Sequence, residues 1–293
     1  MRSGPPLILD GAMGTELERR GFDARLPLWS AWALIEAPDL VKRIHADYAR
    51  AGAQVLTAAA FRTTRYTLAK ENLASWADEL TALAIRLARE AAEDVNPGAE
   101  ISVAGSLAPL EDCYHPEWAP AGEVLAKEHA HTAEMLAAAG ADLILVETQN
   151  SAREALIAAK AALDTKLPVW VSLMPRRSHE LFNGDPLVAT AKAVRESGAE
   201  AILINCCPPE LAAEAFRTLR EAMPEARLGV YPNSGSLKVQ PWEFTERITP
   251  SAFARWALEL AGEADILGGC CGTTPEHVAA LVQALKETGH WSS

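Results

Sequence analysis

Eight short apolar runs alternate with longer amphipathic segments along this chain of 293 residues. Each run has the length of a buried strand, whereas the segments between them repeat their apolar residues with a helical period. The apolar runs are Leu7–Asp10, Ala53–Ala58, Ile101–Gly105, Leu143–Glu147, Val169–Leu173, Ala201–Asn205, Leu228–Tyr231 and Ile266–Gly268. The main helical segments are Ala74–Val95, Ala121–Ala139, Ala152–Leu163, Leu187–Ser197, Glu210–Met223 and Pro250–Ala261. Strands and helices that alternate in this way indicate parallel strands joined by right-handed crossovers.

Eight such units in a chain of this length predict an α/β fold, namely a (β/α)₈ barrel. A doubly wound open sheet is the alternative, but no Gly-x-Gly-x-x-Gly fingerprint follows the first apolar run. No low-complexity linker or shift in composition divides the chain. We therefore expect residues 1–293 to form one domain.

A barrel places its chemistry at the C-terminal ends of its strands. Asp10 ends the first run, Glu147 ends the fourth and Asn205 ends the sixth. Tyr231-Pro232-Asn233-Ser234-Gly235 begins at the end of the seventh run, and Gly268–His277 follows the eighth. The barrel prediction therefore brings five polar strand ends to one mouth.

The stretch Gly268–His277 carries two adjacent cysteines, Cys270 and Cys271, within a frame of glycines just before a predicted helix start. Thr274 is expected to be the N-cap, with Pro275 at the first helical position and Glu276 completing a capping box from Thr273. The positive end of this helix should favour thiolate over thiol. Two thiolates do not complete a tetrahedral metal site, so a third ligand must come from elsewhere.

The third sulfur is expected from Asn205-Cys206-Cys207, at the end of another strand. Three cysteines would hold a zinc ion at the mouth and leave its fourth position open, which is the pattern of a catalytic site. The alternative is that both cysteine pairs are small core hydrophobes. Cys113 has no partner motif and is expected to be an incidental thiol.

The net charge and the number of cysteines limit which binding partners and which compartment are expected for this chain. Lys and Arg number 27 against 39 Asp and Glu, which gives a formal charge of −12. Because no basic cluster is interleaved with aromatic residues, a nucleic-acid partner is not expected. No window approaches the roughly 18 apolar residues of a membrane span, so a membrane partner is not expected either. An odd number of cysteines, five, is not typical of a disulfide framework and favours a reducing cytoplasm.

Two carboxylates beside an open zinc position suggest a pocket for an amino acid. Asp10 and Glu147 could hold an ammonium group, and the loop Gly11–Gly14 could offer backbone N–H groups to a carboxylate. Each acid also has a purely structural interpretation, which for Asp10 is to cap the following helix.

The sequence resembles the homocysteine S-methyltransferase family over nearly its whole length. The resemblance rests on Asp10–Leu17, Leu28-Trp29-Ser30, Glu147-Thr148, Asn205-Cys206, Tyr231–Gly235 and Gly268–Pro275. It implies a (β/α)₈ barrel and a zinc ion held by Cys206, Cys270 and Cys271. It also implies that homocysteine is the methyl acceptor, with Asp10, Gly11 and Glu147 binding its amino acid end. Asn205 is expected to be a further substrate-binding residue. This chain has a second cysteine after Asn205 where many relatives have one, so a shifted turn would make Cys207 the ligand instead.

A zinc site rich in thiolates is negatively charged, which favours a small onium compound as the methyl donor. The resemblance is strongest to the branch that uses S-methylmethionine, and betaine or another donor is the alternative. One or two aromatic rings that follow strands are expected near such a cation. The candidates are Trp29, Trp32, Phe61, Tyr66, Tyr114, Trp118 and Trp242.

Two alternative functions stay open, namely the same transfer to a selenol acceptor and a homocysteine- or zinc-binding protein without catalysis. A zinc hydrolase is disfavoured, because three thiolates donate too much charge to the metal for it to activate water. The seven histidines are expected to be solvated or to cap helices.

Overall fold

The computed structural model describes residues 4–98, 100–239 and 242–291. Eight parallel strands form one sheet in the order β1-β12-β9-β8-β5-β4-β3-β2. The strands are β1 (Leu7–Ile8), β2 (Val55–Thr57), β3 (Ser102–Leu107), β4 (Leu143–Gln149), β5 (Val169–Leu173), β8 (Ala201–Asn205), β9 (Leu228–Tyr231) and β12 (Ile266–Leu267). Each of the eight apolar runs overlaps one of these strands, although β3 and β4 continue past the predicted ends at Gly105 and Glu147.

The sheet closes on itself between its first and second strands. Leu9 forms a parallel bridge with Val55, and the backbone N–H of Asp10 donates to the carbonyl of Val55 at 3.0 Å. On the other side, the N–H of Gln54 donates to the carbonyl of Ile8 at 2.8 Å. Closure removes the exposed strand edges and confirms the (β/α)₈ barrel.

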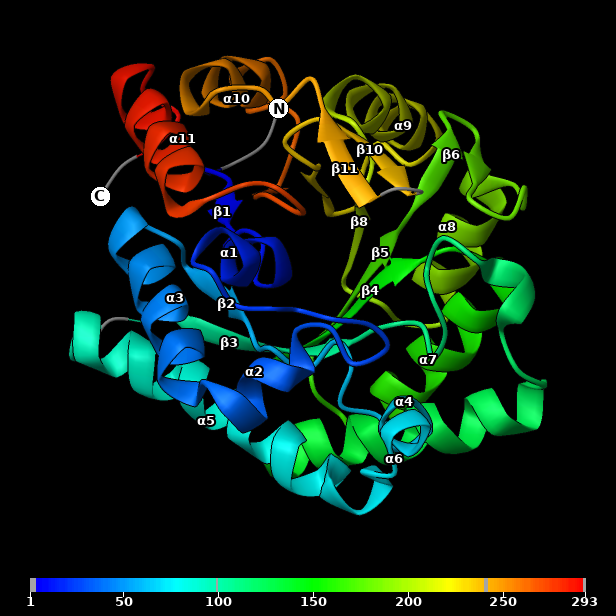
Figure 1. Ribbon diagram of the computed structural model, residues 1–293. Helices are drawn as coiled ribbons and strands as arrows, with labels where there is room; N and C mark the ends of the chain where they lie inside the picture. Colours follow the sequence, from blue (N-terminus) through cyan, green and yellow to red (C-terminus); the bar gives the residue numbers. More distant parts are fainter. Residues whose placement is uncertain (1–3, 99, 240–241, 292–293) are drawn as a thin grey trace.

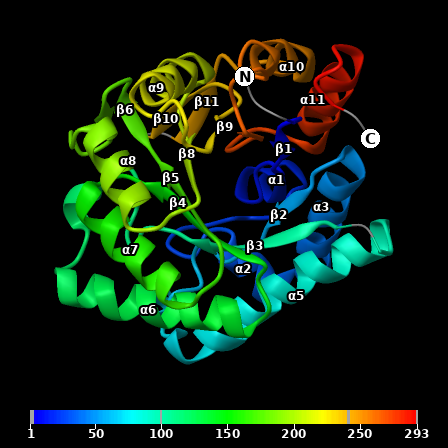
Figure 2. The same cartoon turned by 180° about the vertical axis from the view of Figure 1, so that it is seen from behind.

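The longer helices of the described residues surround the barrel (Figures 1 and 2). They are α3 (Pro38–Ala51), α5 (Ala77–Val95), α6 (Gly122–Ala138), α7 (Ala152–Asp164), α8 (Leu187–Glu196), α9 (Pro209–Ala222), α10 (Pro250–Leu258) and α11 (Pro275–Glu287). The predicted segment Ala74–Val95 is divided, because Ala74–Trp76 forms a 3₁₀ turn ahead of α5. Among the described residues, no helix is long and apolar enough to cross a membrane.

Shorter elements decorate the loops. They are α1 (Gly14–Arg19), α2 (Ala31–Glu36), α4 (Arg65–Leu68), and the hairpins β6 (Pro175–Arg177) with β7 (Glu180–Leu181) and β10 (Ser236–Val239) with β11 (Trp242–Thr245). Helices α2 and α4, of six and four residues, are too short for a periodic apolar pattern to identify them.

The core has two layers, as the alternation of strand side chains requires. One set of strand residues fills the barrel interior: Leu9, Val55, Ala104, Leu143, Leu145, Trp170, Ala201, Leu203, Tyr231 and Ile266. Their neighbours along the strands, such as Ile144, Ile202 and Val230, pack outward against the helices. Side chains therefore fill the barrel interior, and the loops that follow the strands stand on the C-terminal strand ends.

Candidate active site

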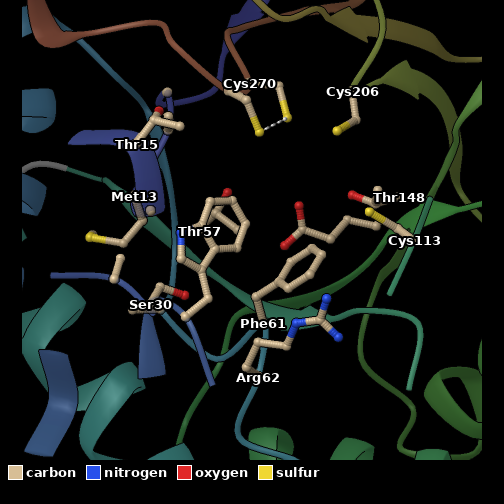
Figure 3. Close-up of a pocket in the computed structure, with 18 of the residues that line it drawn as sticks. Met13, Thr15, Ser30, Thr57, Phe61, Arg62, Cys113, Thr148, Cys206 and Cys270 are labelled. Atoms are coloured by element: carbon tan, nitrogen blue, oxygen red, sulfur yellow. Dashed lines mark hydrogen bonds between the residues drawn. The ribbon is translucent and has the colours of Figure 1, made fainter. Parts of the chain in front are cut away.

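Three thiols from two distant segments meet at the barrel mouth. Cys206 follows β8, and Cys270 and Cys271 follow β12. The Sγ atoms of these three residues all lie within 4.8 Å of one another, and those of Cys270 and Cys271 are 4.0 Å apart (Figure 3). Cys207 instead lies in the hydrophobic core between the barrel and its helices. The structure thus brings together the set with Cys206 rather than the alternative with Cys207.

The glycine frame is required for this arrangement. A Cβ on Gly268 would come within 2.5 Å of the Cβ of Leu9, and one on Gly269 would overlap the side chain of Thr273. The backbone N–H of Gly269 donates to the carbonyl of Asp10 at 3.0 Å, and that of Cys270 donates to the carbonyl of Pro232 at 2.7 Å. These bonds tie the double-cysteine turn to the ends of β1 and β9.

Helix α11 begins directly after this turn. Thr274 is its N-cap and Pro275 its first residue, as predicted. The prediction that Glu276 completes the capping box is wrong, because His277 does so. The N–H of Thr274 donates to Nδ1 of His277 at 3.2 Å. Capping boxes usually place Glu or Gln three residues after the N-cap, so a histidine there gave no recognisable signal.

The protein alone does not favour thiolates in this cluster. The neighbouring sulfur of Cys206 and burial raise the pKa of the Cys270 and Cys271 thiols well above the ordinary range. The expectation that the helix terminus would lower these pKa values is therefore wrong for the free protein, because three sulfurs repel negative charge on one another. A bound cation would reverse this balance, since thiolates are its ligands.

The geometry of the three sulfurs fits a tetrahedral metal ion. Zinc–sulfur bonds of about 2.3 Å at tetrahedral angles place neighbouring sulfurs roughly 3.8 Å apart. The 4.0 Å between Cys270 and Cys271 lies close to that value. All five cysteines are free thiols, so no disulfide competes for the cluster.

The two predicted carboxylates also reach the mouth, and both are held by hydroxyl residues of neighbouring strands. The N–H of Thr57 donates to Oδ2 of Asp10 at 2.7 Å, and its hydroxyl donates to Oδ1 at 2.9 Å. The hydroxyl of Ser106 donates to the carboxyl of Glu147. These hydrogen bonds come from uncharged groups, so they fix the position of both acids without supplying a positive charge.

Burial disfavours the charged form of both acids. It raises the pKa of the Asp10 carboxyl well above its ordinary value, with a smaller contribution from the negative charge of Glu147. Burial also raises the pKa of Glu147 to about 8, which the hydrogen bond from Ser106 partly opposes and the charge of Cys270 increases. Two acids in this state would be stabilised in their charged forms by a cation between them.

Asn205 lies behind the cavity wall. Its side chain is fully buried, and its Oδ1 accepts a bond from the hydroxyl of Ser172 at 2.7 Å. Its Nδ2 donates to the hydroxyl of Thr148 at 2.9 Å and lies 3.9 Å from Sγ of Cys270. Asn205 was expected to bind substrate, but its amide is already used to support the cluster.

A cavity of about 540 Å³ opens above the cluster. Asp10, Gly11, Glu147 and the three clustered cysteines line it together with Cys113, which was expected to be incidental. Four of the aromatic candidates, Trp29, Phe61, Tyr114 and Trp118, also line it. Trp32 instead packs under the guanidinium of Arg25 at 4.2 Å, and the side chain of Trp242 lies outside the described residues.

Several residues of the site were not identified from the sequence. They are Thr57, Arg62 and Ser106, together with the specific contact of Tyr114, whereas Thr148 was named as part of Glu147-Thr148 but given no role. Thr57 and Thr148 stand at the ends of predicted strands, which was a usable signal. Ser106 directly follows the predicted run Ile101–Gly105 and so offered the same signal, whereas Arg62 offered none, because isolated Arg residues are common on loops.

The histidines take no part in the cluster. His277 caps α11, which is one of the two roles expected for the histidines. His45 and His129 are fully buried rather than solvated. His129 forms a buried pair with Glu154, from Nε2 to Oε1 at 3.0 Å. That carboxylate also accepts a bond from the N–H of Leu110 and so holds the loop between β3 and α6.

The fold and the site together define a class: a (β/α)₈ barrel that carries a thiol metal centre and two buried acids at its mouth. Comparison with known proteins identifies the family. The family model for homocysteine S-methyltransferase matches residues 7–285. The chain therefore belongs to the homocysteine S-methyltransferase family and is an enzyme of that family.

Individual relatives agree with this assignment. The homocysteine S-methyltransferase of Escherichia coli (strain K12) is 36% identical over 94% of this chain and 94% of its own length. The homocysteine S-methyltransferase YbgG of Bacillus subtilis (strain 168) is 30% identical over 97% of this chain and 96% of its own. The crystal structure of the homocysteine methyltransferase MmuM from E. coli in its metallated form matches with a TM-score of 0.83 and 32% identity. That match covers 95% of this chain and 96% of the crystallised one.

Proposed function

We propose that this enzyme transfers a methyl group from a small onium donor, S-methylmethionine in preference to betaine, to the sulfur of homocysteine. The product is methionine. The observation that carries the proposal is the convergence of Cys206, Cys270 and Cys271 within 4.8 Å, at a cavity that two buried acids also line. The free thiols fit a reducing compartment, and we propose the cytoplasm.

The three thiols would hold a zinc ion as Cys₃ ligands. When bound, zinc supplies the positive charge that lets the thiol of homocysteine lose its proton near neutral pH. Zinc suits the site because soft thiolate donors in tetrahedral geometry select it over calcium or magnesium. Asn205 contributes by keeping Cys270 in place rather than by touching the substrate.

Asp10 and Glu147 would bind the ammonium group of homocysteine. Each acid is buried and keeps lone pairs free beyond those used by Thr57 and Ser106. A bound ammonium would offset the cost of burying two like charges. Gly11 and the start of α1 line the cavity and would receive the carboxylate through backbone N–H groups.

The reaction is a displacement at the methyl carbon. A new bond forms between the homocysteine sulfur and the methyl carbon, while the bond from that carbon to the donor's onium atom breaks. The electron pair of the broken bond stays on the donor, which leaves as a neutral group. Because opposite charges cancel on the way to the transition state, a pocket that excludes water assists the step.

The aromatic side chains of the cavity would receive the onium group. Trp29 and Phe61 meet edge to face, with ring centroids 6.4 Å apart, and both line the cavity. Tyr114 contributes a third ring near the cluster. Aromatic faces attract quaternary and sulfonium cations without requiring a carboxylate at that point.

The test is a donor panel with the zinc-loaded enzyme. S-methylmethionine, S-adenosylmethionine, betaine and methylfolate are each supplied with homocysteine whose carbon chain carries deuterium. Mass spectrometry then separates methionine made from the acceptor from methionine left by the donor. We expect labelled methionine mainly from S-methylmethionine. Turnover with methylfolate alone would contradict an onium donor, and no turnover with any donor would favour a binding protein without catalysis.

A further inference from the structure

Arg62, in the loop between β2 and α4, is the single lysine or arginine among the described residues that line the mouth cavity. The other charged lining residues are acids: Asp10, Glu18, Asp112 and Glu147. The side chain of Arg62 is almost completely buried, since the residue is 5% exposed. Buried arginines are normally paired with a carboxylate, so this cation in an acidic cavity needs an explanation.

The partners of Arg62 leave much of its guanidinium unused. Its Nη1 donates to the backbone carbonyl of Glu111 at 3.0 Å. Its Nε is buried and has no hydrogen-bond partner, and no ion pair of Arg62 is found in the described part of the chain. The carboxylate of Glu111 is turned to Lys70 instead, at 2.6 Å. A guanidinium has five N–H donors, and a carboxylate is the acceptor that its planar fork fits best.

The position of Arg62 indicates which ligand would bring that carboxylate. Figure 3 shows Arg62 beside Phe61, on the side of the cavity away from Cys206 and Cys270. The guanidinium carbon lies 5.2 Å from the centroid of the Phe61 ring. From the cluster outward, the cavity therefore presents the thiols with their acids, then the aromatic rings, then a cation. A donor with its onium group at the rings and an anionic end farther out matches this order.

We propose that Arg62 binds the carboxylate of the methyl donor and so restricts donors to onium compounds that carry one. This inference rests on the proposed function and narrows its substrate class. The acid group of homocysteine is a poorer candidate, because Asp10 and Glu147 hold its amino-acid end beside the thiol cluster. A phosphate- or sulfate-bearing donor would meet the four acids of the cavity with more negative charge than a single carboxylate.

A structural role is the competing explanation, since Nη1 of Arg62 also holds the carbonyl of Glu111. If that were the whole role, removing the guanidinium would weaken every donor equally. If Arg62 binds a carboxylate, the loss is confined to donors that have one. The discriminating quantity is therefore the preference between two donors that differ only in this group.

The experiment compares S-methylmethionine with its carboxamide, in which a neutral amide replaces the carboxylate. The zinc-loaded wild-type enzyme, Arg62→Gln, Arg62→Lys and the control Arg65→Gln are measured with both donors. Arg65 lies three residues on in α4, pairs with Asp78 at 3.0 Å and is exposed, so its loss should change nothing. Binding is followed by calorimetry and methyl transfer by mass spectrometry, so that each proposal has its own readout.

We expect the wild type to prefer the acid over the amide by roughly 10- to 100-fold in Kd and kcat/KM, the effect of one charge-assisted contact. Arg62→Gln should abolish this preference, while the Kd and kcat/KM of the amide donor and the KM of homocysteine stay as in the wild type. Arg62→Lys should retain part of the preference for the acid. Equal use of acid and amide by the wild type would overturn the inference, even if the Gln variant does not fold. If Arg62→Gln raised the KM of homocysteine and left the donor preference unchanged, the inference would also be overturned. Selective binding of the acid without methyl transfer would sink the proposed function but keep the role of Arg62.

Discussion

The hydroxyl group of Tyr114 lies 3.3 Å from Sγ of Cys206, and so connects the long loop after β3 to the thiol cluster. The same loop is held from behind, because the amide of Asn150 donates to the carbonyl of Cys113 at 3.0 Å. The ring of Tyr114 also meets Phe182 edge to face, with centroids 5.7 Å apart. A segment far from the cysteines in sequence therefore places a hydroxyl group within hydrogen-bond distance of one of them.

Replacing Tyr114 by Phe should weaken the metal centre without unfolding the protein. When Cys206 is a thiolate the hydroxyl is the donor, and a charge-assisted bond of this kind contributes about 1.5–3 kcal/mol. We expect the Kd for zinc to rise roughly 10- to 100-fold and the sulfur-to-metal absorption of the cobalt-substituted enzyme to shift. An unchanged spectrum and affinity would show that the contact at 3.3 Å is incidental.

The two cysteines after Asn205 should behave oppositely. Cys206→Ala should reduce bound zinc and methyl transfer together, as should Cys270→Ala, because each removes one of three ligands. Cys207→Ala is the matched control: it should keep zinc and cost about 1 kcal/mol of stability for a small core cavity. Zinc per chain after dialysis, measured by mass spectrometry, distinguishes them. Loss of zinc in the Cys207 variant would restore the shifted-turn alternative.

Binding of an amino acid should release a proton from Glu147. Its pKa is about 8 in the free protein, so the carboxyl is largely neutral at pH 7, and an ammonium group requires the charged form. Affinity should therefore increase as the pH rises towards about 8, by up to tenfold per pH unit. Methionine is the right ligand for calorimetry, because it has no thiol proton of its own to lose.

Glu147→Gln provides the control for this measurement. The amide cannot ionise, so the variant should bind methionine roughly 10- to 100-fold more weakly at pH 8 and lose the pH dependence of Glu147. A wild-type affinity that stays constant between pH 6 and 8 would argue against Glu147 as an ammonium ligand.

His45, in α3, should make the fold sensitive to acid. It is fully buried, neither ring nitrogen has a hydrogen-bond partner, and burial lowers its pKa from 6.5 to about 4. Between these values the unfolded chain binds the proton and the folded protein does not, so stability falls as the pH drops through this window. The loss amounts to roughly 3 kcal/mol. Urea unfolding of His45→Leu should lack this slope, and an identical slope would assign the acid sensitivity to other groups.

The glycine frame can be tested with a matched pair. Gly269→Ala should destabilise the protein by roughly 1–3 kcal/mol and reduce zinc binding, because its Cβ would overlap Thr273. Gly262→Ala should be neutral or slightly stabilising, since a Cβ there meets no atom within 4 Å and its φ is not positive. Urea midpoints compare the two directly. Equal effects would mean that the double-cysteine turn tolerates a side chain.

The eight strands could be predicted because each is a compact apolar run, and closure of the sheet followed from their number. Cys270 and Cys271 could be found for a similar reason: adjacent cysteines among glycines form a local pattern. Arg62 could not, since its importance depends on strands and loops that are distant in sequence. Asn205 shows the limit of position as evidence, because a strand-end residue can support the site from behind.

The sequence by itself determined the alternation of strands and helices, the start of α11 at Thr274 and Pro275, and which residues end the strands, since these depend on local pattern and backbone preference. Only the tertiary structure decided that Cys206 rather than Cys207 faces Cys270 and that Arg62 is buried without a carboxylate. The reason is geometric. Adjacent residues of a turn point in different directions, and burial depends on what the rest of the chain packs around them.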